Sequence, residues 1–500
     1  FAVGTILCVV LMAVFMPVLV NDYQQQLKDY NTNVAANEAE LRKVHVYKNI
    51  TPTVYRPPNV LSVFNTGLDK QLDNSEKINI QGLSDTKMET GQTNPLLSVF
   101  PTLDVTLIFK IVISILALLM AYDVISGERE LGTLKLILSS TTARYQVLLG
   151  KVTAGLMTLV VPVTVSFIVG LLILMLSDMV SLTGTEWFRI GLMYFACLIF
   201  VSALFNLGLL FSCLSKNSAI CLVCSMFLWL FFAAIIPNAS AYIASQLKPV
   251  ESAKEFSGKV KAITQQRDNE INELTKDIKG GGSQSDAPDA FGRMYVMLCN
   301  KSFMDYHQKR YPITESVKMK YFNKAFELEK ERTNELLRQK NFGQNIASSS
   351  PTVLFESLMS VLAGTDFGNY ECFKNSVKTY VNEVANHIRS ETENFTLTSY
   401  FTPCKEGDQE KLINLYYKPY MEAKDKTDKA EAMKKVMEVY EKLMKETPSL
   451  GLQNFPKFTY RSQSITESLR QAIPSMAVLI FMSVLFFTLS FVMFLKYDAR

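Results

Sequence analysis

The side chains that could do chemistry are densest in residues 123–139, where acidic, basic and small residues follow an apolar stretch. Residues 126–134 read Ser-Gly-Glu-Arg-Glu-Leu-Gly-Thr-Leu. Ser126 is the expected N-cap of a short helix, and Glu128 and Glu130 fall in its first turn, where the helix dipole favours acidic groups. The leucines that follow predict a helix lying on a membrane surface with its charges facing water. Such a pattern is suited to contact with another protein.

Sequence motifs for catalysis are absent. No Gly-x-x-x-x-Gly-Lys-Ser/Thr loop could cradle a nucleotide phosphate, and neither Gly-x-Ser-x-Gly nor His-Glu-x-x-His occurs. Cys221-x-x-Cys224 has the spacing of a zinc or redox pair, but it lies in an apolar stretch without a histidine. Cys299, Cys372 and Cys404 allow one disulfide and one free thiol, and their spacing leaves the pairing open. We therefore expect no catalytic site, no metal site and no cofactor on this chain.

The elements that must position residues 123–139 are apolar. The chain is 48% hydrophobic and 20% charged with a net charge of +4, and its charges are strongly segregated. Six stretches contain a single charged residue, Lys110, and each approaches the roughly 20 helical residues that cross a hydrocarbon core about 30 Å thick. Because lipid offers no hydrogen bonds, each stretch must be a helix. The stretches are 1–20, 105–122, 152–177, 190–213, 218–237 and 471–495.

The fold class expected is thus an α-helical membrane protein with six transmembrane helices. A wholly soluble protein, a disordered chain and a nucleic-acid binder are excluded. The first stretch lacks the basic start and the small-x-small site of a signal peptide, so we expect it to be a spanning helix. Lys110 is a candidate intramembrane functional charge, and the alternative is a lysine that snorkels or is paired at the membrane interface.

Basic residues predict the orientation. Segment 123–151, the turn 214–217 and the tail 496–500 contain Lys and Arg, whereas the connection 178–186 contains neither. By the positive-inside rule the basic segments are cytoplasmic. Segments 21–104 and 238–470 are then extracytoplasmic, and they are long enough for a large domain.

This extracytoplasmic domain should be mostly helical with minor β structure. Residues 263–278, 313–337 and 411–444 have apolar residues at helical spacing. The glycine-rich run at 280–286 predicts the mobile tip of a helical hairpin. Residues 60–64, Val-Leu-Ser-Val-Phe, indicate a short strand or a buried edge.

Residues 126–139, Ser-Gly-Glu-Arg-Glu-x-Gly-Thr-Leu-Lys-Leu-x-Leu-Ser, with Arg-Tyr-Gln at 144–146 and Leu-Gly-Lys at 149–151, resemble the coupling-helix segment of ABC transporter permeases of the type 2 exporter class. The closest resemblance is to a bacterial branch with two large extracytoplasmic insertions. Tyr-Arg-Pro-Pro-Asn at 55–59 and Lys-Tyr-Asp at 496–498 resemble that branch too.

The resemblance implies a permease subunit that couples ATP hydrolysis by a separate ATPase to substrate movement. It implies two ATPase copies that carry ATP and Mg, a second permease, identical or paralogous, and a place in the bacterial cytoplasmic (inner) membrane. Glu128, Arg129 and Glu130 would then make charged contacts with the ATPase, and Leu131 and Leu134 would anchor in its groove. The full set of coupling residues implied is Gly127, Glu128, Arg129, Glu130, Leu131, Gly132, Thr133 and Leu134, the glycines allowing close backbone approach.

Two other classes of function stay open. A membrane-anchored sensor or scaffold would use its extracytoplasmic helices to bind an envelope partner, and a membrane enzyme would need a catalytic cluster that the sequence lacks. The cargo is open as well, since lipid, lipoprotein, peptide and antibiotic are all compatible with a large outer domain.

Overall fold

The structure is a computed structural model that describes residues 2–70, 72–78, 104–139, 143–177, 179–278, 301–396 and 449–496, with a few single residues between 400 and 442. Six of its helices are long and apolar enough to cross a membrane, which confirms the predicted fold class. These candidate spans are Ala2–Arg42, Val105–Glu130, Arg144–Met175, Gly184–Leu214, Ser218–Leu247 and Ile465–Leu495.

The spans are built from the following elements: α1 (Ala2–Arg42), α2 (Val105–Ile108), the π-helical turn η3 (Phe109–Ile113), α3 (Ser114–Ala121), α4 (Ser126–Glu130), α6 (Arg144–Met175), α7 (Gly184–Leu214), α8 (Ser218–Leu230), the π-helical turn η4 (Phe231–Ile235), α9 (Ile236–Leu247) and α18 (Ile465–Leu495). The other elements are the 3₁₀ turns η1 (Tyr47–Asn49) and η2 (Val60–Val63), the strands β1 (Thr53–Tyr55) and β2 (Ser75–Lys77), and the helices α5 (Thr133–Leu138), α10 (Ala253–Leu274), α12 (Lys301–Ala347), α13 (Pro351–Ala363) and α14 (Phe367–Glu391).

Each predicted span overlaps one of these helices, but the helices extend past the predicted limits. Helix α1 includes Pro17 and continues from the apolar stretch into the polar run that ends at Arg42, because neither glycine nor proline occurs between Pro17 and Arg42. The fifth span likewise continues to Leu247. Helix α18 begins earlier than predicted, at a capping box formed by Ser464 and Glu467. Apolar composition therefore marks the middle of a span and not the end of its helix.

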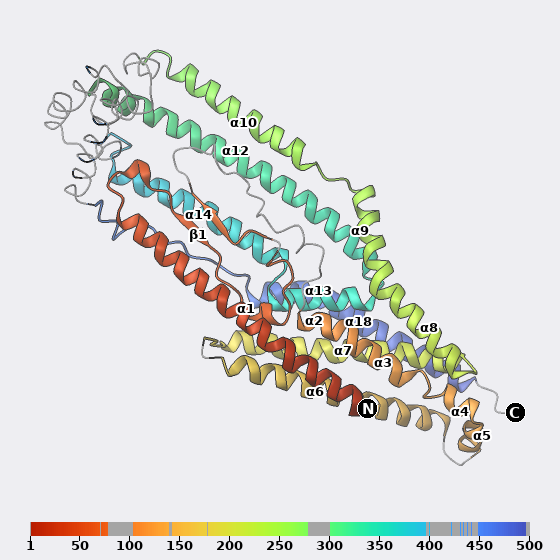
Figure 1. The fold of residues 1–500 in the computed structure, drawn as a ribbon. Coiled ribbons are helices and arrows are strands. Elements are labelled where there is room, and N and C mark those ends of the chain that lie inside the picture. The colour runs from red at the N-terminus through yellow and green to blue at the C-terminus, as the bar shows by residue number, and fades with distance from the viewer. Residues whose placement is uncertain are drawn as a thin grey trace.

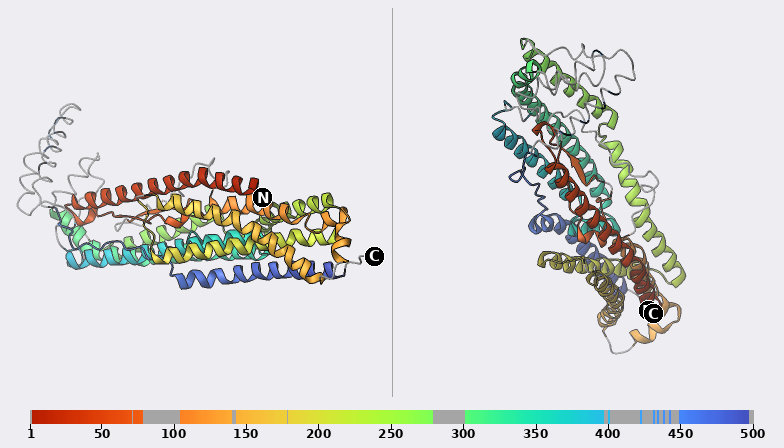
Figure 2. Two further views of the ribbon diagram at one scale, coloured as in Figure 1. Left: turned by 90° about the horizontal axis from the view of Figure 1, so that it is seen from below. Right: turned by 60° about the vertical axis from the view of Figure 1, so that its left-hand side comes forward.

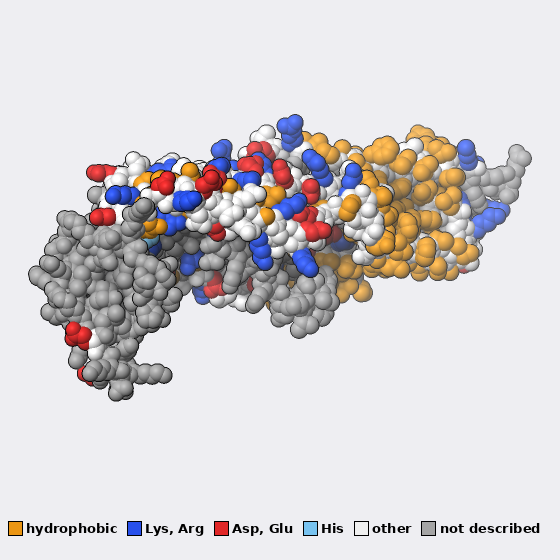
Figure 3. Space-filling view, turned by 90° about the horizontal axis from the view of Figure 1, so that it is seen from above, with side chains coloured by type: hydrophobic (Ala, Val, Ile, Leu, Met, Phe, Trp, Pro, Cys, Tyr) orange, Lys and Arg blue, Asp and Glu red, His pale blue; other side chains and the backbone are white. Residues whose placement is uncertain are grey.

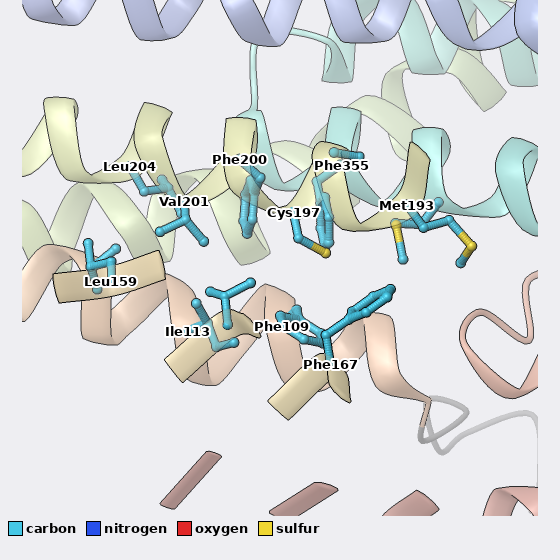
Figure 4. Close-up of a cluster of buried hydrophobic side chains, with 14 of the residues drawn as sticks. Phe109, Ile113, Leu159, Phe167, Met193, Cys197, Phe200, Val201, Leu204 and Phe355 are labelled. Atoms are coloured by element: carbon cyan, nitrogen blue, oxygen red, sulfur yellow. The ribbon is translucent and has the colours of Figure 1, made fainter. Parts of the chain in front are cut away.

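Helix α7 is the centre of the membrane-spanning bundle. In the most apolar 18-residue segment of α7, 67% of the residues are buried, which is more than in the same segment of any other candidate span described. Side chains from η3, α6, α7 and α13 point toward one another in the core (Figure 4). Helices α6 and α7 approach so closely at Gly155 that a Cβ there would lie 2.3 Å from the ring of Phe205. The bundle thus has a close-packed centre of the kind that tolerates little added volume.

Polar side chains also join spans within the bundle. Asn206 on α7 donates to the Ser483 hydroxyl at 3.0 Å, and Ser202 lies 3.1 Å from the same hydroxyl. Hydrogen bonds of this kind hold helices together in lipid, where no hydrophobic force acts between them. They make α7 and α18 one packing unit.

The remaining helices form an elongated helical body, which we define as α10, α12, α14 and the C-terminal part of α1 with the β1–β2 pair (Figures 1 and 2). Helices α10 and α12 lie side by side, as the predicted hairpin requires, although its tip at 280–286 lies outside the described residues. Residues 411–444 also lie outside the described part, apart from single positions. Strands β1 and β2 pair antiparallel, with Val54 opposite Glu76. Residues 60–63 are a buried 3₁₀ turn, so the buried edge is confirmed and the strand is wrong.

Charge follows this division of the molecule. In the space-filling view, hydrophobic side chains cover the part formed by the spans, whereas Lys, Arg, Asp and Glu cover the helical body (Figure 3). An apolar surface of that size is stable only in contact with lipid or protein. The chain is therefore a multi-pass membrane protein with a large polar helical region.

Asp104 caps α2 where the second span begins. Its carboxylate accepts hydrogen bonds from the backbone N–H groups of Leu107 (2.7 Å) and Thr66 (3.1 Å). Burial raises the pKa of Asp104 from 3.8 to about 6, although the two backbone donors oppose that rise. Folding therefore favours the protonated form of the Asp104 carboxyl group.

We expect Asp104 to make the protein less stable as pH rises. Its raised pKa contributes stability that is fully present below pH 4 and is lost as pH rises through 6. Asparagine does not titrate, and it has one acceptor oxygen for the two N–H donors, which adds a cost that does not depend on pH. From pH 4 to pH 7 wild type should therefore lose about 2 kcal/mol of stability relative to Asp104→Asn. Unfolding of the purified protein in detergent at both pH values measures this. The exposed Asp29→Asn is the control, and a pH-independent difference for Asp104→Asn would contradict the assignment.

Candidate functional site

The predicted contact segment forms α4 and α5 at the end of the bundle opposite the helical body (Figure 1). The sequence pattern predicts one short helix, but the structure has two, separated at Gly132. This glycine has φ of 75°, in the left-handed region that other residues rarely adopt. A Cβ at Gly132 would meet no atom within 4 Å, so within this chain the glycine serves backbone conformation and not close approach.

The N-terminus of α4 is capped by a residue from another helix. Ser126 is the first residue of α4 and not its N-cap, so that expectation is wrong. The backbone N–H groups of Ile125 and Ser126 both donate to the hydroxyl of Ser212, near the end of α7, at 2.9 Å. Both Ser126 and Ser212 are fully buried. A side chain from the fourth span thus accepts the backbone N–H groups at the start of α4, which a local N-cap side chain would otherwise accept.

The three charged residues of the segment bind neighbouring spans of the same chain. Glu128 forms an ion pair with Lys151 on α6, and Lys151 also donates to the carbonyl of Val124 at 2.8 Å. Arg129 donates to the carbonyl of Ser215, just after α7, at 3.1 Å. These contacts connect α4 to the third and fourth spans.

Glu130 connects α4 to the fifth span. Its carboxylate accepts the backbone N–H of Ser218, the first residue of α8, at 3.1 Å. The other oxygen of Glu128 is buried without a hydrogen-bond partner among the described residues. The sequence predicted that these three charged side chains face a partner protein. In the structure each of them makes at least one bond to a neighbouring part of the chain, and these bonds hold α4 in place.

The exposed face of the segment is formed by other residues. Leu131 is 78% exposed and Leu136 is 72% exposed, whereas Leu134 is fully buried in the bundle core. In this arrangement Leu134 is therefore not accessible to a partner, and its role as an anchor stays a prediction. Leu136 was not predicted, although helical spacing could have found it, because a residue two positions from an inward-facing one points roughly the opposite way. Gly132 and Thr133 lie on the exposed side between the two leucines, while Gly127 is half-buried.

Lys110 lies in η3, near the end of its span that faces α13. It forms an ion pair with Glu356 on α13, and its side chain is 14% exposed. This favours the interpretation of an interface-paired lysine over that of an isolated intramembrane charge. The sequence offered no means of finding Glu356, which is 246 positions away.

The other candidate groups do not form a site in the described part of the chain. Cys221 is buried and Cys224 is exposed, and no described group of three or more His, Cys, Asp or Glu side chains could hold a metal ion. Cys299 and Cys404 lie outside the described residues, so the disulfide question stays a prediction.

Comparisons with known proteins bear on the whole chain. A search of curated proteins finds no match. The family described as ABC-2 family transporter protein matches residues 4–499, which include all six spans, the α4–α5 segment and the helical body. The chain belongs to the ABC-2 family of transporter proteins.

Proposed function

We propose that this chain is the permease subunit of an ATP-binding-cassette transporter, and that it couples ATP hydrolysis by a separate ATPase subunit to movement of a substrate across or out of the membrane. One observation carries the proposal: the α4–α5 segment exposes two leucines while its buried side is bonded to several spans. Leu131 and Leu136 form an apolar contact surface outside the membrane-spanning core. Apolar anchors of this kind fit a groove on a soluble partner.

The contacts of α4 support a mechanical role. The segment continues from α3 of the second span, and it is bonded to the third span through Lys151, to the fourth through Ser212 and to the fifth through Ser218. A displacement of α4 by a docked ATPase therefore acts on four spans together. Closely packed helices move as bodies and not by gradual deformation, so such a displacement can change the arrangement of the bundle.

The assembly that we propose has two ATPase subunits carrying ATP and Mg, and two permeases, identical or paralogous. It lies in a bacterial cytoplasmic membrane with α4 and α5 in the cytoplasm and the helical body on the outer side. The helical body would receive cargo from the membrane or hand it to an envelope protein.

Reconstitution tests the proposal. The purified chain in lipid vesicles should hydrolyse no ATP. When a candidate ABC ATPase subunit is added, hydrolysis should rise above the sum of the separate components, because docking links the two cycles. Protein-free vesicles and an ATPase that lacks its catalytic glutamate are the controls. ATP hydrolysis by the chain alone, surviving removal of contaminants, would contradict the assignment.

A further inference from the structure

The fifth span contains a π-bulge whose hydrogen bonds are completed by α13. One continuous helix runs from Ser218 to Leu247, and η4 interrupts its regular pattern in the middle. The N–H of Ile236 donates to the carbonyl of Phe231, five residues earlier, instead of Phe232, four residues earlier. A π-bulge of this kind is frequent at functional positions in helices.

The sequence explains why one carbonyl group in the bulge lacks a backbone donor. In the π register the carbonyl of Phe232 would accept from residue 237, which is Pro237 and has no N–H. The carbonyl of Phe232 is therefore left without a backbone donor. In an apolar setting such a group must find another partner.

Helix α13 supplies that partner twice. The hydroxyls of Ser350 and Thr352, at the start of α13, donate to the Phe232 carbonyl at 2.8 and 3.0 Å. Both side chains are fully buried, so water does not compete for these bonds. These two bonds to the Phe232 carbonyl fit the π register only. If the span were a regular α-helix here, Ile236 would bond to Phe232, and the carbonyl without a donor would be that of Ala233, turned by about 100°.

The same helix also holds the bulge in the second span. Glu356 of α13 pairs with Lys110 in η3. The two bulged spans touch through Trp229 on α8, whose indole N–H donates to the Ser114 hydroxyl, next to η3, at 2.8 Å. Helix α13 thus contacts both irregular turns at once.

We propose that α13 sets the hydrogen-bond register of the fifth span. With α13 docked, Ser350 and Thr352 hold the Phe232 carbonyl and the span keeps its bulge. When α13 withdraws, the span returns to the α register and its two halves turn relative to each other by about 100°, with a change of about 1.5 Å in length.

This turn would connect distant parts of the molecule. The half before the bulge begins at Ser218, which bonds to Glu130 of α4. The half after the bulge packs on the helical body, where a Cβ at Gly343 of α12 would lie 3.2 Å from Cβ of Ala244 on α9. The inference concerns the chain alone and holds whether or not an ATPase docks on α4.

Two contacts, one before η4 and one after it in the fifth span, report whether the span is in the π or the α register. Trp229 can be followed by fluorescence in a Trp187→Phe background, since the chain has two tryptophans. Ala244→Cys with Gly343→Cys should form a disulfide readily, because the two Cβ atoms approach the distance of a disulfide. A turn of about 100° between the halves must disrupt at least one of these contacts.

The test is the double variant Ser350→Ala with Thr352→Val, which removes both hydroxyls. We expect either a tenfold slower disulfide cross-link between positions 244 and 343, or a shifted Trp229 emission with at least twofold stronger quenching by brominated lipid. Thr352→Val alone, which preserves side-chain shape, should give a smaller change of the same kind. Ser349→Ala is the matched control, because the Ser349 hydroxyl bonds only within its own turn, to Ile346. Values for the double variant equal to those of Ser349→Ala would overturn the proposal.

Pro237→Ala provides a second and independent arm. Alanine supplies an N–H that completes the α register at the Ala233 carbonyl, and it removes the proline ring that crowds that carbonyl, so the return to the α register is no longer opposed. On this background the double variant should move the probes at least as far from the wild-type values as it does when Pro237 is present. Probe values that stay at those of wild type for the double variant on the Pro237→Ala background would also overturn the proposal.

Discussion

Aspartate in place of both Leu131 and Leu136 should lower the affinity for the ATPase subunit at least 100-fold. The two side chains are the exposed apolar groups of the α4–α5 segment. Burying a leucine contributes roughly 1.5–3 kcal/mol, and a carboxylate buried in its place adds an unpaired charge. Co-purification of the two subunits, or titration of labelled ATPase against the permease in nanodiscs, measures the loss.

The control for this variant is Leu336→Asp, an exposed leucine on α12 of the helical body. It introduces one carboxylate in the helical body, away from α4 and α5, and should leave the affinity unchanged. Size-exclusion chromatography should show that both variants remain folded, since neither site lies in the core. Wild-type affinity for the Leu131→Asp, Leu136→Asp variant would mean that the ATPase binds elsewhere.

Lys374→Met should destabilise the helical body by about 2–3 kcal/mol. The Lys374 ammonium lies 2.8 Å from Glu76 of β2 and 3.2 Å from Glu329 of α12. Burial alone would lower the pKa of Lys374, but the two carboxylates raise it above its usual range. Removing the lysine leaves two half-buried carboxylates facing each other, and a partly buried pair that loses one member costs less than the 3–5 kcal/mol of a fully buried one.

Lys378→Met is the matched control, because Lys378 lies one turn further along α14 and pairs with the exposed Glu327. It should cost less than about 1 kcal/mol. Native-state hydrogen exchange of α12, α14 and the β1–β2 pair measures both values as free energies of opening. Equal costs for the two variants would show that the Glu76–Lys374–Glu329 group adds nothing beyond a surface pair.

The sequence by itself determined the membrane architecture. Charged residues are almost absent from six stretches, and lipid admits such stretches only as helices, so the number and approximate positions of the spans followed without knowledge of any contact. The helical hairpin of the body followed in the same way, from apolar spacing in α10 and α12. The segment 126–134 could be singled out because charges, glycines and leucines are concentrated there directly after a span.

The sequence could not determine which side chains of that segment face a partner. Glu128, Arg129 and Glu130 look alike as exposed charges, yet each bonds to a different part of the chain. Leu131 and Leu134 look alike as anchors, yet one is exposed and the other buried. Which of these groups is free depends on where α4 lies against α6, α7 and α8.

Only the tertiary structure decided the partners of the functional groups, because those partners are remote in the chain. Ser212 binds Ser126 over 86 positions, Ser350 binds the Phe232 carbonyl over 118, and Glu356 binds Lys110 over 246. Local patterns predict helices because helix hydrogen bonds join residues four apart. The cap of α4, the support of the fifth-span bulge and the pairing of Lys110 instead depend on the packing of whole helices, which no local spacing encodes.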